Sequence, residues 1–577
     1  MTAMNAAIKT SIGPPFLPSA FVLITLGLAC LGLLSKAQAV SPAPDGGYPG
    51  GNTAEGTNAL LSRSTGTYNT AIGIYSLLSL TDGKFCTAVG AGTLLANTAD
   101  SNTATGAGVL LSNTTGANNT ANGAFALFFN TATGNTAIGS NALLNNTTGG
   151  TLANIQGFDV GPNVAVGWQA LESNTVASAN TAVGYQALHS FTTGPVGLEQ
   201  LGFCTAVGFQ ALANATGNGF DNSGFGYQAL YNNTDGNGNT ANGAFALFSN
   251  TTGADNTASG DGALFSNTTG SFNTADGLSA LFSNTTGGVN TATGQFALFF
   301  NTTGDANTAN GESALYSNTS GFGNTAIGPD ALSGNTTGND NTATGLAALL
   351  TNIIGSGNTA NGYHALFIST GNGNTALGFG AGDALTTGDN NIDIGYNVHG
   401  AAAESNTIRI GGQDIAITDT FIQGISGATA SGGAAVFVNS NGKLGTMTSS
   451  ARFKDEIKPM DKASEAILAL RPVGFRYKKE IDPQGIPQFG LVAEEVEKVN
   501  SDLVIRDAKG RPYTVRYEQV NAMLLNEFLK EHGKVEKLEG ALGAVTKRLN
   551  EQEARIQKVS AELEVSKAAT HMALNSQ

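Results

Sequence analysis

A 17-residue repeat dominates the chain and limits what it can fold into. The tripeptide Asn-Thr-Ala at residues 239 to 241 recurs at 17-residue steps, with its asparagine at Asn256, Asn273, Asn290, Asn307, Asn324, Asn341 and Asn358. Weaker copies extend the series to about twenty-one units between residues 52 and 411, with insertions after Asn135 and Asn180. Such regularity is typical of a solenoid, in which each repeat packs mainly on its neighbours.

The composition of the repeat predicts β structure. Seventeen residues are too few for two packed helices, and the consensus N-T-A-x-G-x-x-A-L-F-x-N-T-T-G is rich in residues of low helix propensity. We therefore predict a mainly β fold in which each unit forms one coil of a long parallel β-solenoid. Two short strands per coil are expected, at Thr240-Ala241 and at Ala246-Leu247-Phe248, joined by turns in which Gly, Asn and Thr accept tight or left-handed geometry.

The Ala-Leu-Phe triplet bears on assembly. In a strand, Ala246 and Phe248 would point to one face and Leu247 to the other, so both faces would be apolar. One face can fill the coil, and the other leaves an apolar stripe along the rod unless another chain covers it. Oligomerisation is one explanation. The alternative is a wide, flattened coil that buries both faces within one chain.

Charge and cysteine content exclude some partners and cross-links. The net charge of −15 arises almost entirely in the repeat region, which argues against nucleic acid or an anionic membrane as a partner there. Cys86 and Cys204 each replace the first asparagine of a coil and lie six coil steps apart, too far for a disulfide. Both are predicted to be small packing residues. We expect neither a cofactor nor a metal.

The first 39 residues have the features of a secretory signal peptide. Lys9 precedes an apolar run from Ala20 to Leu34, and small residues follow at Ala37-Gln38-Ala39. A membrane anchor is the alternative, but the run is shorter than the roughly 20 residues that span a bilayer. We therefore predict export, a linker at 40–51, no stable membrane span after signal removal, and a secreted or cell-surface protein.

The chain changes character after residue 411. We expect a transition or neck at 412–447, a small α+β domain at 448–518, a coiled coil at 519–567 and a tail at 568–577. With Asn521 as position a, ten of thirteen a and d positions are apolar over six heptads, which predicts a parallel coiled coil. The alternative is a single amphipathic helix packed on its own domain.

Two parts of the chain resemble known families. The repeats resemble the head domains of trimeric autotransporter adhesins, whose Asn- and Gly-punctuated repeats form parallel β-rolls in a homotrimer, although the period differs. The motifs "SSARFKDEI", "LRPVGFRYK" and "GLVAEEVE", followed by the heptads, resemble the C-terminal intramolecular chaperone domain of endosialidase-type phage tailspikes. That resemblance covers about residues 447 to 567. It implies a domain that trimerises, helps the preceding fibre to fold and then releases itself as a serine peptidase acting in cis.

The same resemblance places a Ser-Lys dyad at Ser449 and Lys454, with the cut between Thr448 and Ser449. Ser450 stands where the family often has Asp, and it is the rival nucleophile. A serine hydroxyl needs a base, and a lysine becomes one only if burial or nearby charge lowers its pKa, so Lys454 is expected to be partly buried. Residues five apart lie about 140° around a continuous helix, so Ser449 should precede any helix. The alternative is that Ser449 merely caps a helix bearing Lys454.

These inferences together predict an exported homotrimeric, adhesin-like fibre that matures by self-cleavage, without turnover on external substrates. One alternative is a tailspike-like enzyme that degrades glycans, although no paired carboxylates stand off the repeat register. Another is a fibre whose C-terminal domain stays as a permanent, uncleaved trimer clamp. A cell-surface or glycan ligand is expected for the rod, with specificity in the insertions at 150–162 and 190–203.

Overall fold

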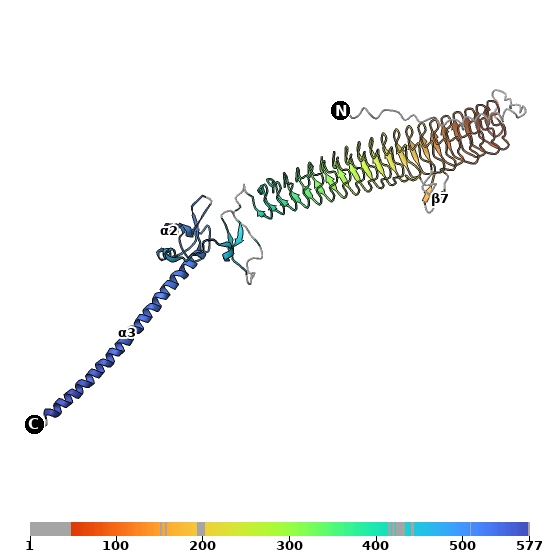
Figure 1. Cartoon of the computed structure of the whole chain (residues 1–577). Helices are drawn as coiled ribbons and strands as arrows, with labels where there is room; N and C mark the ends of the chain where they lie inside the picture. Colours follow the sequence, from red (N-terminus) through yellow and green to blue (C-terminus); the bar gives the residue numbers. More distant parts are fainter. Residues whose placement is uncertain are drawn as a thin grey trace. The chain divides into compact units, whose positions relative to one another are not determined.

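The computed structural model describes residues 48–150, 153–155, 158–192, 202–412, 417, 422, 433–439, 443–507 and 509–574. The predicted signal peptide and most of the linker therefore lie outside the described residues, as does much of the predicted neck. The chain forms two compact units, Met1–Thr420 and Phe421–Gln577, and each is described separately (Figure 1).

The first unit is a rod of stacked coils, with one three-residue strand per coil (Figure 1). Its strands are β1 (Thr53–Glu55), β2 (Thr70–Ile72), β3 (Thr87–Val89), β4 (Thr103–Thr105), β5 (Thr120–Asn122), β6 (Thr136–Ile138), β9 (Val164–Val166), β10 (Thr181–Val183), β11 (Thr205–Val207), β12 (Ser223–Phe225), β13 (Thr240–Asn242), β14 (Thr257–Ser259), β15 (Thr274–Asp276), β16 (Thr291–Thr293), β17 (Thr308–Asn310), β18 (Thr325–Ile327), β19 (Thr342–Thr344), β20 (Thr359–Asn361), β21 (Thr375–Leu377), β22 (Ile392–Ile394) and β23 (Ile408–Ile410).

These strands form one 21-stranded parallel sheet, which confirms the predicted mainly β, parallel solenoid with 17-residue coils. Each residue pairs with its equivalent one coil later, as Thr240 does with Thr257 and Ala241 with Ala258. The central alanine of the strand points into the coil and is fully buried, whereas its neighbours face outward. In the first predicted insertion, β7 (Ala153–Ile155) and β8 (Phe158–Val160) form an antiparallel hairpin that projects from the rod (Figure 1).

The second strand predicted for each coil is wrong, because Ala246–Phe248 lies in a turn. Leu247 has a φ of 53°, and the corresponding leucines of most other coils share this left-handed conformation. Left-handed backbone removes the alternation of a strand, so Ala246 and Leu247 both point into the coil and are fully buried. A non-glycine residue in this region costs roughly 1–2 kcal/mol. Filling the core with leucine side chains offsets that cost.

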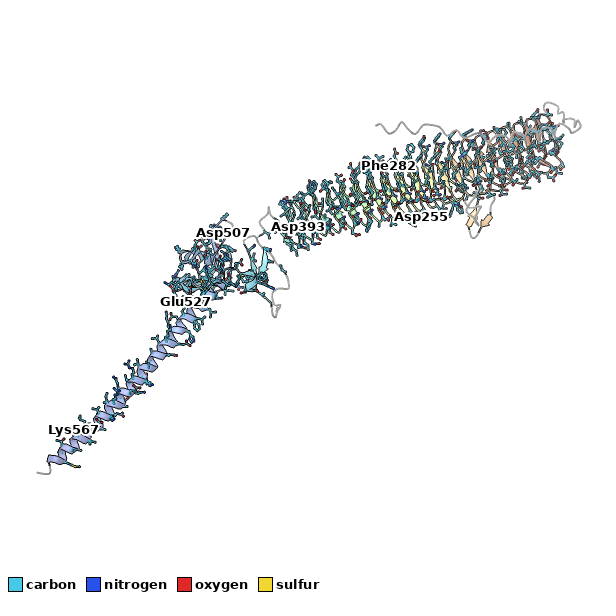
Figure 2. The ribbon with its side chains drawn as sticks, viewed as in Figure 1. Asp255, Phe282, Asp393, Asp507, Glu527 and Lys567 are labelled. Atoms are coloured by element: carbon cyan, nitrogen blue, oxygen red, sulfur yellow. The ribbon has the colours of Figure 1, made fainter. Side chains whose placement is uncertain are left out.

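Phe248 of the same triplet stays on the surface of the rod. It belongs to a column that we call the Phe ladder, in which rings of successive coils stack at centroid distances of 5.0 to 5.4 Å: Tyr231, Phe248, Phe265, Phe282, Phe299 and Tyr316 (Figure 2). These side chains are half-buried in the single chain. The apolar stripe predicted from the triplet therefore exists, but it consists of the phenylalanines and not of the leucines.

Two columns of buried asparagines hold successive coils together. In the first column, the Asn256 backbone N–H and Nδ2 both donate to Asn239 Oδ1 (3.0 and 3.1 Å), and Nδ2 also donates to the Gly270 carbonyl (2.9 Å). In the second, Asn267 Nδ2 donates to Asn250 Oδ1 (2.8 Å) and to the same Gly270 carbonyl (2.9 Å). These bonds satisfy polar turn groups that the tight coil removes from water.

Cys86 and Cys204 occupy the first asparagine column as free, buried thiols, so they form no disulfide. The backbone N–H of the next coil, from Asn102 and Asn222 respectively, bonds to the sulfur in place of an amide oxygen. Burial raises the pKa of Cys204 to about 12. A thiol held in this way packs in the core and is a poor nucleophile.

The last coils of the rod replace core alanine with charge. Asp393 stands at the central strand position of β22 and is buried, 4.0 Å from Arg409 Nη1 of the following coil (Figure 2). Arg409 also forms an ion pair with Glu404. Burial raises the pKa of Asp393 to about 6, although Arg409 opposes this shift. The charged pair closes the apolar core at this end of the rod, as polar terminal repeats do in other solenoids.

The second unit combines small hairpins with a long helix. Its elements are β24 (Val436–Val438), β25 (Leu444–Thr446), η1 (Ala451–Phe453), η2 (Asp461–Ala469), β26 (Val473–Phe475), β27 (Gln488–Gly490), α2 (Ala493–Val499), η3 (Ser501–Leu503), β28 (Val504–Arg506), β29 (Pro512–Val515) and α3 (Tyr517–Leu574). The pairs β24–β25, β26–β27 and β28–β29 are antiparallel. A small core gathers Val496, Leu503, Val504, Val515 and Met523. Among the described residues, no helix is both long and apolar enough to cross a membrane.

Helix α3 packs on its own unit with only one face. Met523 and Glu527, near its start, are buried against that unit. The predicted a and d positions lie elsewhere on the helix, and Leu524, Phe528 and Leu542 are 57%, 65% and 67% exposed. In the described residues, the apolar heptad stripe is therefore not packed on the chain's own domain. The coiled coil itself stays a prediction.

Candidate self-processing site

The predicted dyad lies in a short connection between β25 and η2. Ser449 follows β25 by three residues in irregular backbone, and Ser450 is extended, with φ −64° and ψ 139°. The next residues form the single 3₁₀ turn η1, in which the Phe453 N–H donates to the Ser450 carbonyl (3.0 Å) and the Lys454 N–H to the Ala451 carbonyl (3.1 Å). Lys454 then returns to extended backbone. Ser449 therefore lies before the turn, and Lys454 closes it.

This turn brings the two side chains together. Lys454 Nζ donates a hydrogen bond to Ser449 Oγ over 3.4 Å. On a continuous α-helix, residues five apart would point in different directions, so the contact depends on the extended backbone on both sides of one 3₁₀ turn. To act as the base, the lysine amine must be neutral, because only its free lone pair can accept the serine proton.

The capping alternative does not fit this geometry. Ser450, not Ser449, is the residue that precedes η1, and the Ser450 side chain makes no capping hydrogen bond. The hydroxyl that meets Lys454 is that of Ser449. The catalytic roles of Ser449, Lys454 and the rival Ser450 stay predictions, as does the cut between Thr448 and Ser449.

The expected burial of Lys454 is absent from the single chain. All residues from 443 to 460 are exposed, including both members of the dyad. The physical reason is that this connection contributes nothing to the small core around Val496. The same segment exposes large apolar side chains, with Met447, Phe453 and Ile457 at 56%, 58% and 69%. An apolar surface of this kind around a candidate site is suited to contact with another polypeptide.

A second polar cluster joins η2 to α3, and sequence reasoning missed it. The Ser464 hydroxyl donates to Glu527 Oε1 and accepts from Asn526 Nδ2 (2.7 Å) and Lys530 Nζ (3.2 Å). Lys530 Nζ also donates to Glu527 Oε1 (2.6 Å). These bonds, from Lys530 first and then Ser464, hold the pKa of the Glu527 carboxyl below its usual value (Figure 2). With one donated and two accepted bonds, the hydrogen-bonding capacity of the Ser464 hydroxyl is satisfied. The cluster therefore braces the unit.

Two of the sequence motifs meet in the structure. Strand β26 lies within "LRPVGFRYK" and pairs with β27, which leads into "GLVAEEVE". Arg471 of the first motif binds Glu495 of the second through Nε (3.1 Å) and Nη2 (2.6 Å). This contact lowers the pKa of Glu495. The Leu491 N–H donates to the Tyr517 hydroxyl (3.0 Å), which ties the second motif to the start of α3.

Comparison with known proteins bears on this second unit. No curated protein matches the chain. A family model does match, over residues 449–505, and its first matched residue is Ser449. The matched segment runs from the candidate dyad through both motifs to β28. Residues 449–505 are thus similar to the chaperone of endosialidase family, which confirms the resemblance seen in the motifs.

Proposed function

We propose that the protein is an exported homotrimeric fibre whose C-terminal domain assembles the rod and then separates from it by cutting between Thr448 and Ser449. The observation that carries this proposal is the 3.4 Å contact between Lys454 Nζ and Ser449 Oγ at the first residue of the family match. The proposed role of the rod is attachment or display at a cell surface.

The geometry of the rod supports a need for assisted folding. Most coils place a leucine, such as Leu247 or Leu264, in left-handed backbone, and that cost is offset only when the side chain enters a stacked core. A coil without a neighbour also loses the hydrogen bonds that join its asparagine amides to those of adjacent coils, and keeps only the bonds to its own turn carbonyl. The first coils are therefore unfavourable until several have formed. A C-terminal domain that holds three chains in register would lower that barrier.

The uncovered stripe on α3 supports trimer formation. Its own unit binds the face that carries Met523 and Glu527, so the a and d side chains remain free for other copies. The exposed apolar residues around Ser449 and the half-buried Phe ladder offer further surface for the same purpose. In the family that the motifs resemble, the domain forms a trimer.

The proposed cleavage is an internal acyl shift followed by hydrolysis. Lys454 Nζ, once neutral, accepts the proton of Ser449 Oγ, and the oxygen attacks the carbonyl carbon of Thr448. The bond from that carbon to the Ser449 nitrogen breaks, and the proton passes to this nitrogen as the amine leaves. Water then hydrolyses the Thr448 ester, which gives a Thr448 carboxylate and a free Ser449 hydroxyl.

Assembly would activate the dyad, because Lys454 is exposed in the single chain. A neighbouring copy that covers the segment from Met447 to Ile457 would remove water from the lysine and favour its neutral form. Cleavage would then follow trimer formation. In this proposal, Lys454 is exposed in the single chain and becomes buried only in the trimer.

The test is the intact mass, under denaturing conditions, of the wild-type chain beside Ser449→Ala, Lys454→Arg and Ser450→Ala variants, with native light scattering on each. We expect a fragment that begins at Ser449 in the wild type and in Ser450→Ala, and uncut trimers for Ser449→Ala and Lys454→Arg. If every protein stays whole but trimeric, the domain is a permanent clamp. Loss of cutting in Ser450→Ala alone would assign the nucleophile to Ser450.

A further inference from the structure

A second aromatic column lies in a different position from the Phe ladder. Tyr363, Phe379 and Tyr396 form a short stack there, and four successive coils nearer the N-terminus form a longer one. The residue after each strand's glycine is aromatic in these coils, and the rings stack at centroid distances of 4.9, 4.9 and 5.3 Å. We call this column the ring ladder: Trp168, Tyr185, Phe209 and Tyr227. The four side chains are 41 to 46% exposed, more than those of the half-buried Phe ladder.

A column of amides runs beside the ring ladder. The next residue in each of the four coils is glutamine, and Gln186, Gln210 and Gln228 each donate Nε2 to the Oε1 of the preceding glutamine (2.8, 2.9 and 2.8 Å). These bonds fix the amides in one orientation and leave them partly exposed. Aromatic edges and oriented amides therefore form one continuous strip, with one ring and one amide per coil.

The strip carries no charge, and the equivalent positions of the coils on either side, 136–141 and 240–245, are also uncharged. Residues 164–169, 181–186, 205–210 and 223–228 contain no Asp, Glu, Lys, Arg or His. At equivalent positions further along the rod stand Asp261, Asp276 and Glu312. An uncharged strip in an acidic rod disfavours anionic ligands, because the surrounding carboxylates repel them and no cation binds them.

The Phe ladder does not extend over the first three coils of the ring ladder. At its position, two of them carry Glu172 and His189, whose side chains meet at 2.9 Å, instead of a large apolar group. The Phe ladder begins at Tyr231, where the ring ladder ends at Tyr227. If the Phe ladder faces other copies of the chain, the ring ladder needs a different occupant, because it occupies another column of the coil.

The chemistry of the strip selects that occupant. The ring faces cover one another, so the electropositive ring edges point outward, where they attract oxygen atoms. The hydroxyls of Tyr185 and Tyr227, the indole N–H of Trp168 and the glutamine amides add hydrogen-bonding groups. This pattern repeats with the coil step of about 4.8 Å. That step is about the length of one sugar residue in an extended chain.

We propose that the ring ladder and its glutamines bind a neutral, linear polysaccharide along the rod axis, with one sugar residue per coil. This assignment rests on the proposed role of the rod in attachment. It does not depend on the cleavage, since all of its residues belong to the first unit. It also assigns recognition of the polysaccharide to the surface of the coils, whereas the sequence predicted specificity in the insertions at 150–162 and 190–203.

The experiment measures binding of the full chain with Ser449→Ala, so that the mass does not change by cutting. The probes are immobilised linear glucan, mannan and chitin oligosaccharides, with polygalacturonate and heparin as anionic counterparts. The test variant adds Tyr185→Gln and Phe209→Gln, a residue that another coil carries at this position as Gln295. The matched control is Phe272→Ala, an exposed ring outside both ladders, since Ala306 holds that position in another coil.

We expect binding to at least one neutral polysaccharide, at least tenfold weaker binding by the double variant, and no change in the Phe272→Ala control. Light scattering on each protein reports whether trimers persist. The proposal is overturned by binding to anionic probes only, by no binding, or by equal binding of the double variant. It is also overturned if the double variant alters only the oligomeric state, because the strip would then be a contact between copies.

Discussion

Replacement of Asn307 by alanine tests whether the asparagine columns stabilise the rod. Asn307 Oδ1 accepts from the Asn324 backbone N–H (3.0 Å) and from Asn324 Nδ2 (3.1 Å), and Asn307 Nδ2 donates to the Gly321 carbonyl (2.9 Å). In the alanine variant, the Gly321 carbonyl keeps a bond from Asn318 Nδ2 (2.9 Å). The buried Asn324 N–H loses its acceptor.

The expected loss of unfolding free energy in Asn307→Ala can be worked out from these hydrogen bonds. One orphaned buried N–H costs about 1–3 kcal/mol, and the lost amide bonds cost about 1 kcal/mol more. We therefore expect Asn307→Ala to reduce stability by about 2–4 kcal/mol. Asn307→Cys should cost less, since the sulfurs of Cys86 and Cys204 accept the equivalent N–H in their own coils. Asn310, in the same coil but exposed, is the matched control.

The assay combines denaturant unfolding with hydrogen exchange of peptides that cover residues 318–330, because a stacked rod can open locally. Exchange near Asn324 should accelerate in Asn307→Ala, less in Asn307→Cys, and not in Asn310→Ala. Equal stability of the Asn307→Ala and Asn310→Ala proteins would refute the reasoning. So would a cysteine variant weaker than the alanine variant.

Three further predictions concern other parts of the chain. Because burial raises the pKa of Asp393 from 3.8 to about 6, its protonated form contributes up to about 3 kcal/mol of stability below the lower value, and this contribution is lost as pH rises through 6. Thermal unfolding at pH 5 and 8 should show about half of this loss in wild type and in the exposed control Asp276→Asn, but not in Asp393→Asn. Leu542→Lys should abolish the trimer in sedimentation, whereas Ala544→Lys, outside the a and d stripe, should not. Ser464→Val should lower the unfolding free energy of the second unit by about 1–3 kcal/mol in denaturant titration, and an unchanged value would contradict the role of its hydroxyl as a brace.

The repeat made most of the rod predictable from sequence, because its period fixes the coil length and its composition excludes helix. The wrong second strand has a specific cause. Apolar triplets such as Ala246-Leu247-Phe248 fit a strand by propensity, and the expectation that leucine avoids positive φ is correct for most proteins. Here the packed core outweighs that preference at Leu247. A local pattern cannot reveal such a result, because the stabilisation comes from neighbouring coils.

Part of the candidate site could likewise be predicted from the sequence, and part could not. Ser449 and Lys454 could be found from a motif, since they are close in sequence and belong to a recognisable family segment. The cluster of Ser464, Glu527 and Lys530 could not, because Ser464 lies more than 60 residues from the other two and no periodicity connects them. The exposure of Lys454 could not be predicted from the sequence either. It depends on the packing of the whole unit and, in our proposal, on other copies of the chain.

The amide columns give the rod a dipole along its axis. In the asparagine columns and in the glutamine column, side-chain NH₂ groups such as those of Asn256, Asn267 and Gln186 donate to the amide oxygen of the preceding coil, so these amide dipoles point the same way. The two ends of such a filament differ, with hydrogen-bond donors facing one and acceptors facing the other. At the acceptor end stands the cation Arg409, in the strand position where earlier coils carry alanine. A rod of this kind has a head and a tail, so stacking two identical ends would set dipoles of the same sign against each other.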